Sequence, residues 1–280
     1  MSKDIPGQAH EPSPALRRDV MNALGLLSAG ANVVMQLARL PIGHAVATST
    51  VTSGALTAHP FKRTRTTLGY VVVSLLGTDE ERAALRREVA RQHRAVRSVP
   101  GAPVAYNAAD PELQLWVAAC MYRGALDAIR LIDPEAPPAL LDELYARCAR
   151  FATTLQVAPS SWPADRSAFE DYWATAMKLV AMDDLTRDYL WGIASLSFLP
   201  RPFAVVLGPL HRVITAGFLP EPFRAELGLA WSPSRERLFR ATLRVVVAVN
   251  RALPRVLREF PLNLVLLDTR RRLARGRAFT

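Results

Sequence analysis

Three side chains that could do chemistry together stand in one stretch of the sequence, between positions 60 and 96. Arg63 and Thr67 are four residues apart, so on a helix their side chains share one face. His93 follows on a second expected helix, after a turn at Gly77-Thr78. Two facing helices would aim a cation, a hydroxyl group and an imidazole at one interior space. Such a set suits the binding of an anionic group and a metal ion.

The helix that carries His93 has a clear predicted start. Thr78 and Glu81 form a Thr-x-x-Glu capping box just before the periodic run. Apolar side chains then recur at four and seven residues: Leu85, Val89 and Val96. His93 occupies the one step of this stripe where another aliphatic residue would be expected, so it is predicted to point inward. A buried imidazole must satisfy both ring nitrogens, either by hydrogen bonds or by a metal ion.

Arg63 needs a partner for a similar reason. Its expected helix places Arg63, Thr67, Val71 and Ser74 on one face. An inward guanidinium is costly unless it meets an anion, and the carboxylate of a cofactor would serve as well as a carboxylate of the protein. For His93 the simpler interpretation is a hydrogen-bonded core histidine, which is the commoner role of a lone histidine on an apolar stripe.

The same stretch, and much of the chain around it, resembles a known family. The segments HPFKRTRTTLGY, GTDEER, RQHRAVR and YNAADPELQLWVAAC, and later LPRPF, ITAGFLPEPFRAELGLAW and LPRVLREFP, resemble the MpaB/rubber oxygenase family of latex-clearing protein-like enzymes. The resemblance implies an all-α helical bundle with a globin-like core around a haem pocket, a haem b cofactor and dioxygen chemistry. It also implies that His93 is the proximal iron ligand, and that Arg63 and Thr67 bind the cofactor and take part in catalysis.

The sequence departs from the family pattern at several positions. Ser49 and Thr50 stand near the usual place of a His-Ser pair, and Thr66 stands where rubber-cleaving members have a lysine. Ala118 replaces the histidine of a WVHA motif. Because an alanine cannot ligate iron, the resemblance implies a haem held by His93 with an open distal face.

The segment before residue 79 also lacks a candidate base. No Asp or Glu occurs between positions 20 and 78, so this segment cannot supply a distal carboxylate. We therefore do not carry polyisoprene over as the substrate, and expect an unidentified hydrophobic or lipid-like molecule with dioxygen. His44 is close to the missing pair, but we interpret it as an ordinary hydrogen-bonded histidine. His10, His59 and His211 have no support as ligands.

The spacing of apolar residues indicates an all-α fold, since no strand-like alternation or internal repeat occurs. We expect a flexible arm over 1–14, one helical oxygenase-like domain over 15–268 and a basic tail over 269–280. The apolar stretch 20–40 contains polar and charged residues, so it is expected to form a buried helix rather than a membrane span. Further helices are expected at 110–132, 139–157, 167–183, 185–199 and 238–253.

The formal charge of +10 comes almost entirely from arginines scattered along the expected helices. No zinc-finger spacing, aromatic-basic RNA motif or separate recognition helix accompanies it, so no specific nucleic-acid partner is expected. Acidic partners or anionic lipid headgroups fit the charge better. Cys120 and Cys148 are too few for a disulfide framework. The first residues lack the build of a secretory signal, so a cytoplasmic location is expected.

Two other classes of function stay open at this stage. A non-catalytic haem sensor or carrier would need the same axial histidine but no turnover with dioxygen. A cofactor-free helical protein at the membrane periphery would use the basic tail as its anchor, beside the apolar Leu264, Leu267 and Leu273. The colour of the purified protein separates this second class from the haem proteins.

Overall fold

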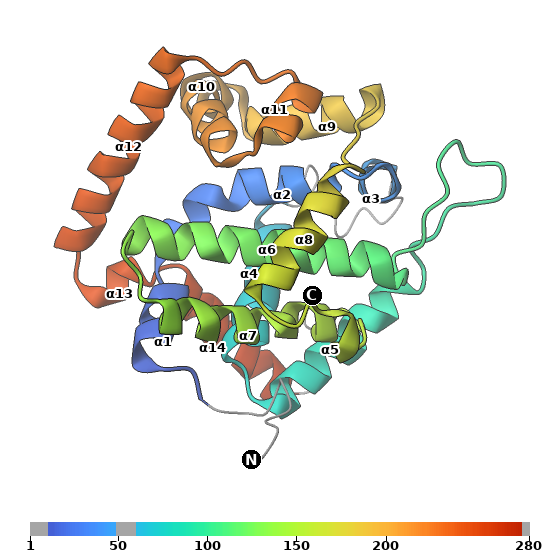
Figure 1. Ribbon diagram of the computed structural model, residues 1–280, viewed down its shortest axis with the longest axis horizontal. Helices are drawn as coiled ribbons and strands as arrows, with labels where there is room; N and C mark the ends of the chain where they lie inside the picture. Colours follow the sequence, from blue (N-terminus) through green and yellow to red (C-terminus); the bar gives the residue numbers. More distant parts are fainter. Residues whose placement is uncertain (1–10, 49–59, 276–280) are drawn as a thin grey trace.

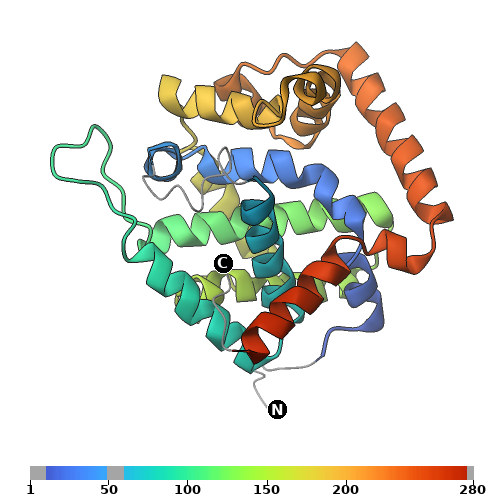
Figure 2. The same cartoon turned by 180° about the vertical axis from the view of Figure 1, so that it is seen from behind.

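The computed structural model describes residues 11–48 and 60–275. Over these ranges the chain forms fourteen α-helices with short 3-10 turns, and the one β-type pairing is an isolated antiparallel bridge between Arg97 and Asn107. The all-α prediction is therefore confirmed. Figures 1 and 2 show the helices stacked in layers around one long central helix, α6 (Pro111–Ile132).

The central helix α6 begins where the sequence predicts. Asp110 is its N-cap, and the Asp110 side chain accepts hydrogen bonds from the backbone N–H groups of Glu112 (2.8 Å) and Leu113 (3.2 Å). Pro111 stands at the first helical position, where its missing N–H costs nothing. On one side α6 packs against α7 (Pro138–Thr154), and on the other against α2 (Ala29–Leu37) and the 3-10 helix η1 (Ala23–Ser28).

The stretch 20–40 is buried as predicted, but it is not one helix. Helix α1 (Pro14–Val20) ends at its C-cap Met21, and Asn22 then caps η1, because its side-chain oxygen accepts a hydrogen bond from the N–H of Leu24 (3.0 Å). Leu16, Ala31 and Val34 are fully buried in the core. Among the described residues no single helix is long and apolar enough to cross a membrane; only the bent pair 14–20 and 23–37 would reach that length together.

A layer of aromatic side chains fills the space between α6, α7 and α8 (Arg166–Met177). Its members stack or meet edge to face: Trp116, Tyr122, Tyr145, Trp162, Phe169 and Trp173. Trp116 is completely buried, and its ring lies 5.2 Å from that of Trp173. These aromatic residues stabilise the core.

The C-terminal third of the described chain wraps around the rest. Helices α9 (Asp184–Ala194), α10 (Arg201–Phe218) and α11 (Glu221–Leu227) form a layer over α2 and α3 (Leu40–Ala47). Helix α12 (Pro233–Ala252) then runs along the edge of the molecule to α13 (Arg255–Arg258). Helix α14 (Leu262–Ala274) returns beside α4 (Pro60–Leu76), and so continues past the expected domain end at residue 268.

Candidate functional site

The candidate site is built on the hairpin of α4 and α5 (Asp79–His93). The turn between the two helices is tight: a Cβ added at Gly77 would lie 2.5 Å from the carbonyl oxygen of Val73. The predicted capping box is confirmed, because Thr78 Oγ1 accepts from the N–H of Glu81 (3.2 Å) and Glu81 Oε2 accepts from the N–H of Thr78 (3.0 Å). The hairpin therefore fixes how α4 lies against the helix that ends at His93.

Polar anchors hold this hairpin from α7. The Tyr70 hydroxyl donates to the carbonyl of Phe151 at 2.7 Å, and Arg147 Nη1 donates to the carbonyl of Leu75 at 3.1 Å. Burial raises the pKa of Tyr70 far above its usual range, so this hydroxyl stays a donor.

Helix α14 holds the hairpin from another side. Arg65 on α4 lies 3.4 Å from Asp268, and Arg270 Nε lies 2.8 Å from Glu81 Oε1. Both pairs are partly exposed, so each contributes little energy by itself. Together with the α7 anchors they fix α4 and α5 in one arrangement, and Arg270 belongs to the body of the protein rather than to a free basic tail.

His93 is half-buried, and its surroundings keep it neutral. Burial lowers the pKa of the imidazole, and the nearby positive charge of Arg63 lowers it further. The Nδ1 atom is buried and has no hydrogen-bond partner among the described residues. A hydrogen-bonded core histidine, the simpler interpretation, would need a partner for Nδ1, and the described residues do not supply one. A neutral imidazole with a free lone pair has the form that ligates a metal ion.

Arg63 is more accessible than the sequence pattern predicts. Its side chain is exposed, yet the protein around it lowers the pKa of the guanidinium by desolvation. No described carboxylate pairs with Arg63. The structure thus brings Arg63 close to His93 and leaves its cation without an anion.

Thr67 lies one helical turn beyond Arg63 and is also exposed. It shares the face of α4 that carries Arg63, as its spacing predicts. The Thr67 hydroxyl has no hydrogen-bond partner among the described residues, whereas the neighbouring Thr66 hydroxyl donates to its own helix at the carbonyl of Lys62 (2.9 Å). Thr67 is therefore the hydroxyl of this pair that can reach a ligand.

Tyr189, on α9, is a member of the site that the sequence pattern did not indicate. It is half-buried, and its pKa is raised by burial while the charge of Arg63 lowers it, which places the phenol near the guanidinium. Helix α9 is held by Asp183, which caps it by accepting from the N–H of Thr186 (2.9 Å) and also binds the ring of His44. Burial raises the pKa of Asp183, but these hydrogen bonds outweigh burial and lower it to about 2.

The other histidines take ordinary roles where the structure describes them. His44 binds Asp183, as expected, and His211 Nδ1 lies 2.8 Å from the carbonyl oxygen of Ala194. Ser49 and Thr50, at the place of the missing His-Ser pair, lie outside the described residues. Ala118, at the place of the missing second histidine, is fully buried in the core of α6.

The residues present fit a haem better than a metal bound by protein alone. No cluster of three or more His, Cys, Asp or Glu side chains that could hold a metal ion occurs in the described ranges. A haem iron needs only one axial protein ligand, because the porphyrin supplies four nitrogens. His93 offers a neutral, unbonded imidazole, and Arg63 offers a cation for a propionate.

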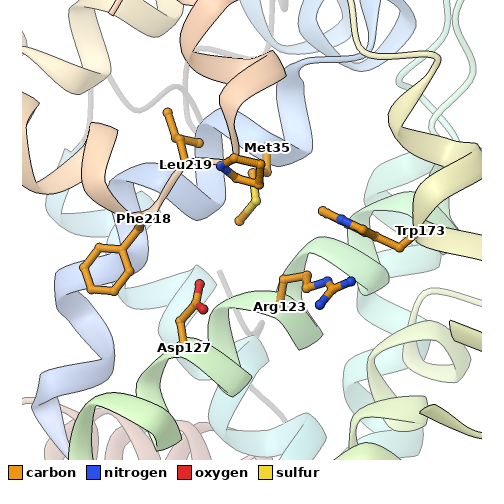
Figure 3. A pocket seen from close by; sticks show the side chains of 7 residues that line it. Met35, Arg123, Asp127, Trp173, Phe218 and Leu219 are labelled. Atoms are coloured by element: carbon orange, nitrogen blue, oxygen red, sulfur yellow. The ribbon is translucent and has the colours of Figure 1, made fainter. Parts of the chain in front are cut away.

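A pocket of about 240 Å³ lies beside α6 (Figure 3). Asp127 and Arg123 project into it from α6, opposite Phe218 and Leu219 at the end of α10. Burial raises the pKa of Asp127 to about 6, although Arg123 and Arg130 oppose this. No described side chain pairs with the carboxylate. The Arg123 guanidinium instead pairs with Glu170 and lies 4.8 Å from the Trp173 ring.

Comparison with known proteins adds a family to this geometry. A family model described as the catalytic domain of ER-bound oxygenase mpaB/B′ and rubber oxygenase matches residues 17–248. Two uncharacterized mycobacterial proteins, one from Mycobacterium bovis and one from Mycobacterium tuberculosis, are each 42% identical to the chain over 252 residues. That alignment covers 90% of this chain and 99% of each relative. No solved structure gives a significant match.

Proposed function

From the premise that the chain belongs to the family of the mpaB/B′ and rubber oxygenase catalytic domain, we propose that it is a haem b-dependent oxygenase with His93 as the proximal iron ligand. One observation carries the proposal: His93 is neutral, its Nδ1 is buried without a partner, and it lies beside an unpaired arginine. A buried nitrogen without a partner calls for an explanation, and a bound group is one. An axial bond to iron would satisfy the ring.

The residues around His93 have separate roles in this proposal. Arg63 binds a haem propionate, because a desolvated guanidinium without a carboxylate partner favours an anion. Thr67 donates a hydrogen bond on the same face, and the Tyr189 phenol lies near Arg63. When bound, the haem supplies the dioxygen chemistry, and the helices supply orientation and control of access.

The family supports only a broad class of substrate. Oxygenases of this family act with dioxygen on a small molecule, and we propose a hydrophobic or lipid-like one. The absence of a carboxylate between positions 20 and 78 and of a lysine at position 66 supports a reaction other than polyisoprene cleavage. The proposed site consists of His93, Arg63 and Thr67, together with Tyr189 near Arg63.

The absorbance spectrum of protein expressed with ample haem tests the ligand. Wild type is expected to show a Soret band, and His93→Ala is expected to lose or strongly shift it. The matched control is His211→Asn, because the asparagine side chain can still donate to the carbonyl of Ala194 and the band should be unchanged. An unchanged spectrum in His93→Ala would assign the ligand elsewhere. A colourless wild type would favour the cofactor-free alternative.

Turnover separates an oxygenase from a haem sensor or carrier. Haem-loaded wild type should consume dioxygen in the presence of unsaturated lipids. Loaded protein without any dioxygen consumption would favour the sensor or carrier.

The haem content tests the role of Arg63. Arg63→Gln should retain less haem than wild type, because the propionate loses its cation. Arg63→Lys keeps the charge but not the planar guanidinium, so its haem content should lie between those of wild type and Arg63→Gln. Full haem content in Arg63→Gln would remove Arg63 from the site.

A further inference from the structure

The outer side of α12 is an apolar surface without a covering element. Most of the large hydrophobic side chains that are exposed in the described ranges lie between residues 203 and 267. On α12 itself Leu238, Val245 and Val249 are 48%, 63% and 55% exposed. They recur at seven and four residues, so they form one stripe along the helix. Val256 and Leu257 of α13 follow directly and are also exposed, at 69% and 53%.

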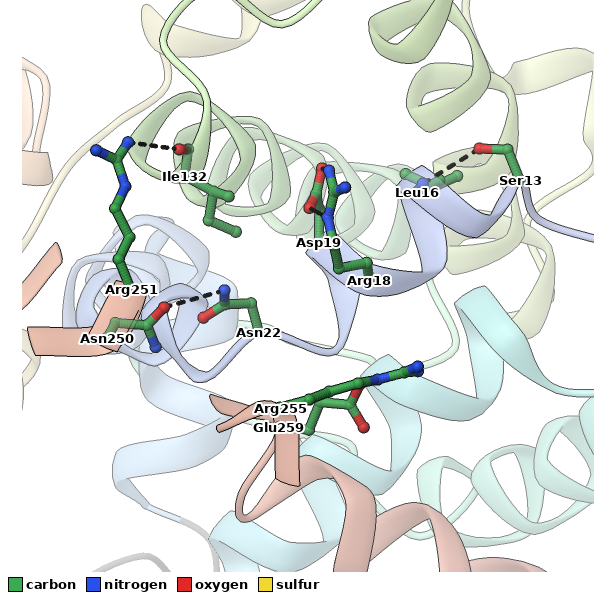
Figure 4. A network of polar contacts seen from close by, with 10 residues as sticks. All are labelled: Ser13, Leu16, Arg18, Asp19, Asn22, Ile132, Asn250, Arg251, Arg255 and Glu259. Atoms are coloured by element: carbon green, nitrogen blue, oxygen red, sulfur yellow. Dashed lines mark hydrogen bonds and ion pairs between the residues drawn. The ribbon is translucent and has the colours of Figure 1, made fainter. Parts of the chain in front are cut away.

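Contacts on the inner side of α12 fix which face looks outward. Phe239 is buried, with its ring 5.2 Å from Phe218 of α10. Near the other end, Asn250 is buried and accepts a hydrogen bond from Asn22 at 3.3 Å (Figure 4). Figure 4 also shows Arg251 Nη2 donating to the carbonyl of Ile132 at 3.4 Å. Because both ends of the inner face are anchored, the apolar stripe cannot turn inward.

A row of arginines runs beside the apolar stripe. It consists of Arg237, Arg240, Arg244 and Arg251, spaced by three, four and seven residues, and all four are exposed. The one acidic residue of α12 is Glu236, which pairs with Arg240. Arg244 has no carboxylate partner among the described residues. Helix α12 thus carries an anchored inner face, an exposed apolar stripe and a basic row that Glu236 neutralises only at Arg240.

We propose that α12 and α13 form a docking surface for an anionic phospholipid membrane. A helix with aliphatic residues on one face and arginines beside them lies in the headgroup region, where the aliphatic side chains reach the acyl chains and the guanidiniums bind phosphates. The formal charge of +10 favours approach to such a surface. A second copy of the chain is a poorer occupant, since its identical arginine row would lie against this one.

The proposal stands apart from the haem, because none of its residues contacts the His93 site. Leu264 and Leu267 of α14, which were expected in a tail anchor, are exposed as well, at 55% and 45%, whereas Leu273 packs against the core. The stripe that we propose to dock lies on α12 and α13. Neighbouring exposed apolar side chains of this kind mark sites of protein or membrane contact.

Co-sedimentation with lipid vesicles tests the surface on the full chain. Wild type is expected to bind vesicles of phosphatidylcholine that contain about one third phosphatidylglycerol, and to bind pure phosphatidylcholine vesicles at least about tenfold more weakly. Val245→Gln with Val249→Gln keeps the charge but removes the apolar stripe, and should weaken binding by about tenfold or more. The matched control is Val99→Gln with Leu179→Gln, which changes two exposed apolar residues elsewhere and should bind as wild type does.

A second pair of variants isolates the charge. Arg240→Gln with Arg244→Gln should weaken binding to anionic vesicles by about tenfold or more, while Arg86→Gln with Arg87→Gln, exposed on α5, changes the net charge equally and should have little effect. All substituted side chains are exposed, so circular dichroism should show wild-type folding. If the valine pair lowers stability, the arginine pair still decides the question.

Three results would overturn the proposal. The first is that wild type stays in the supernatant with anionic vesicles. The second is that the α12 and α5 arginine variants lose vesicle binding equally, which would mean that net charge alone attracts the lipid. The third is a wild-type dimer, detected by light scattering, that becomes a monomer in Val245→Gln with Val249→Gln. That result would assign the face to contact between copies of the chain.

Discussion

Asp127 carries an energetic cost that can be measured at neutral pH. Burial raises its folded-state pKa to about 6, from 3.8. Between these two values the folded protein binds more protons than the unfolded chain, so the free energy of unfolding falls as pH rises from about 4 to about 6. Above pH 6 the full cost of a buried, unpaired carboxylate is present.

Asp127→Asn should therefore stabilise the protein at pH 8 and change little at pH 4. The upper limit is about 3 kcal/mol, because one pKa unit corresponds to about 1.4 kcal/mol, and partial exposure reduces the gain to about 1–2 kcal/mol. Urea unfolding at both pH values measures the difference. The control is the same substitution at Asp171, which is exposed on α8. A gain that is equal at both pH values would contradict burial as its cause.

At the scale of single residues, the sequence identified side chains that depend on local spacing. His93 could be singled out because it interrupts an apolar stripe on its own helix, and Arg63 and Thr67 because they are one turn apart. Tyr189 could not, since it lies far along the chain and reaches Arg63 only through the packing of α9. The exposure of Arg63 and Thr67 depends equally on tertiary structure, because periodicity does not distinguish a buried face from an exposed one.

At the scale of elements, the α4–α5 turn sets the relation between Arg63 and His93. Gly77→Ala would place a Cβ 2.5 Å from the Val73 carbonyl oxygen and 2.9 Å from Val73 Cγ1, so the turn must open. We expect a loss of about 1–3 kcal/mol in the free energy of unfolding. If the haem proposal holds, haem retention should fall as well, because Arg63 and His93 would move relative to each other.

The control for the turn is Gly192→Ala on α9. A Cβ there would have only one neighbour within reach, Ser197 Cβ at 4.0 Å, so the substitution should be neutral or slightly stabilising. Thermal unfolding of the two variants and their haem content after dialysis give the comparison. Equal stability of Gly77→Ala and wild type would show that the turn accommodates a side chain without opening.

Helix starts were predictable because caps are local. Thr78 with Glu81, and Asp110 with Pro111, act within one turn, and both predictions are confirmed. The stretch 20–40 was predicted as one helix, which is wrong. There the Asn22 side chain accepts a hydrogen bond from the N–H of Leu24 and so competes with the helical hydrogen bonds. The apolar composition of the stretch does not reveal such a side-chain hydrogen bond. Short-range polar competition therefore limits the prediction of element boundaries.

At the scale of the whole molecule, the class of fold could be predicted but the placement of its layers could not. Helical periodicity indicates which residues are apolar, not which face of α12 is left open. That face is set by the packing of Phe239 on α10 and by the bond between Asn250 and Asn22, which joins residues 228 positions apart. A surface of this kind can be located only once distant segments are placed together.

Haem binding should also be visible in the stability of the whole fold. A ligand that binds only the folded state at a hundredfold excess over its Kd adds about 2.7 kcal/mol. For a chain of this size that corresponds to a rise of roughly 5–10 °C in Tm.

Haem added to apo-protein should produce this rise in wild type, and far-ultraviolet circular dichroism measures it. It should produce little or none in His93→Ala, because the axial bond is lost. The His211→Asn control should respond as wild type does. A rise of equal size in His93→Ala would mean that haem adheres to an apolar surface without using the site between α4 and α5.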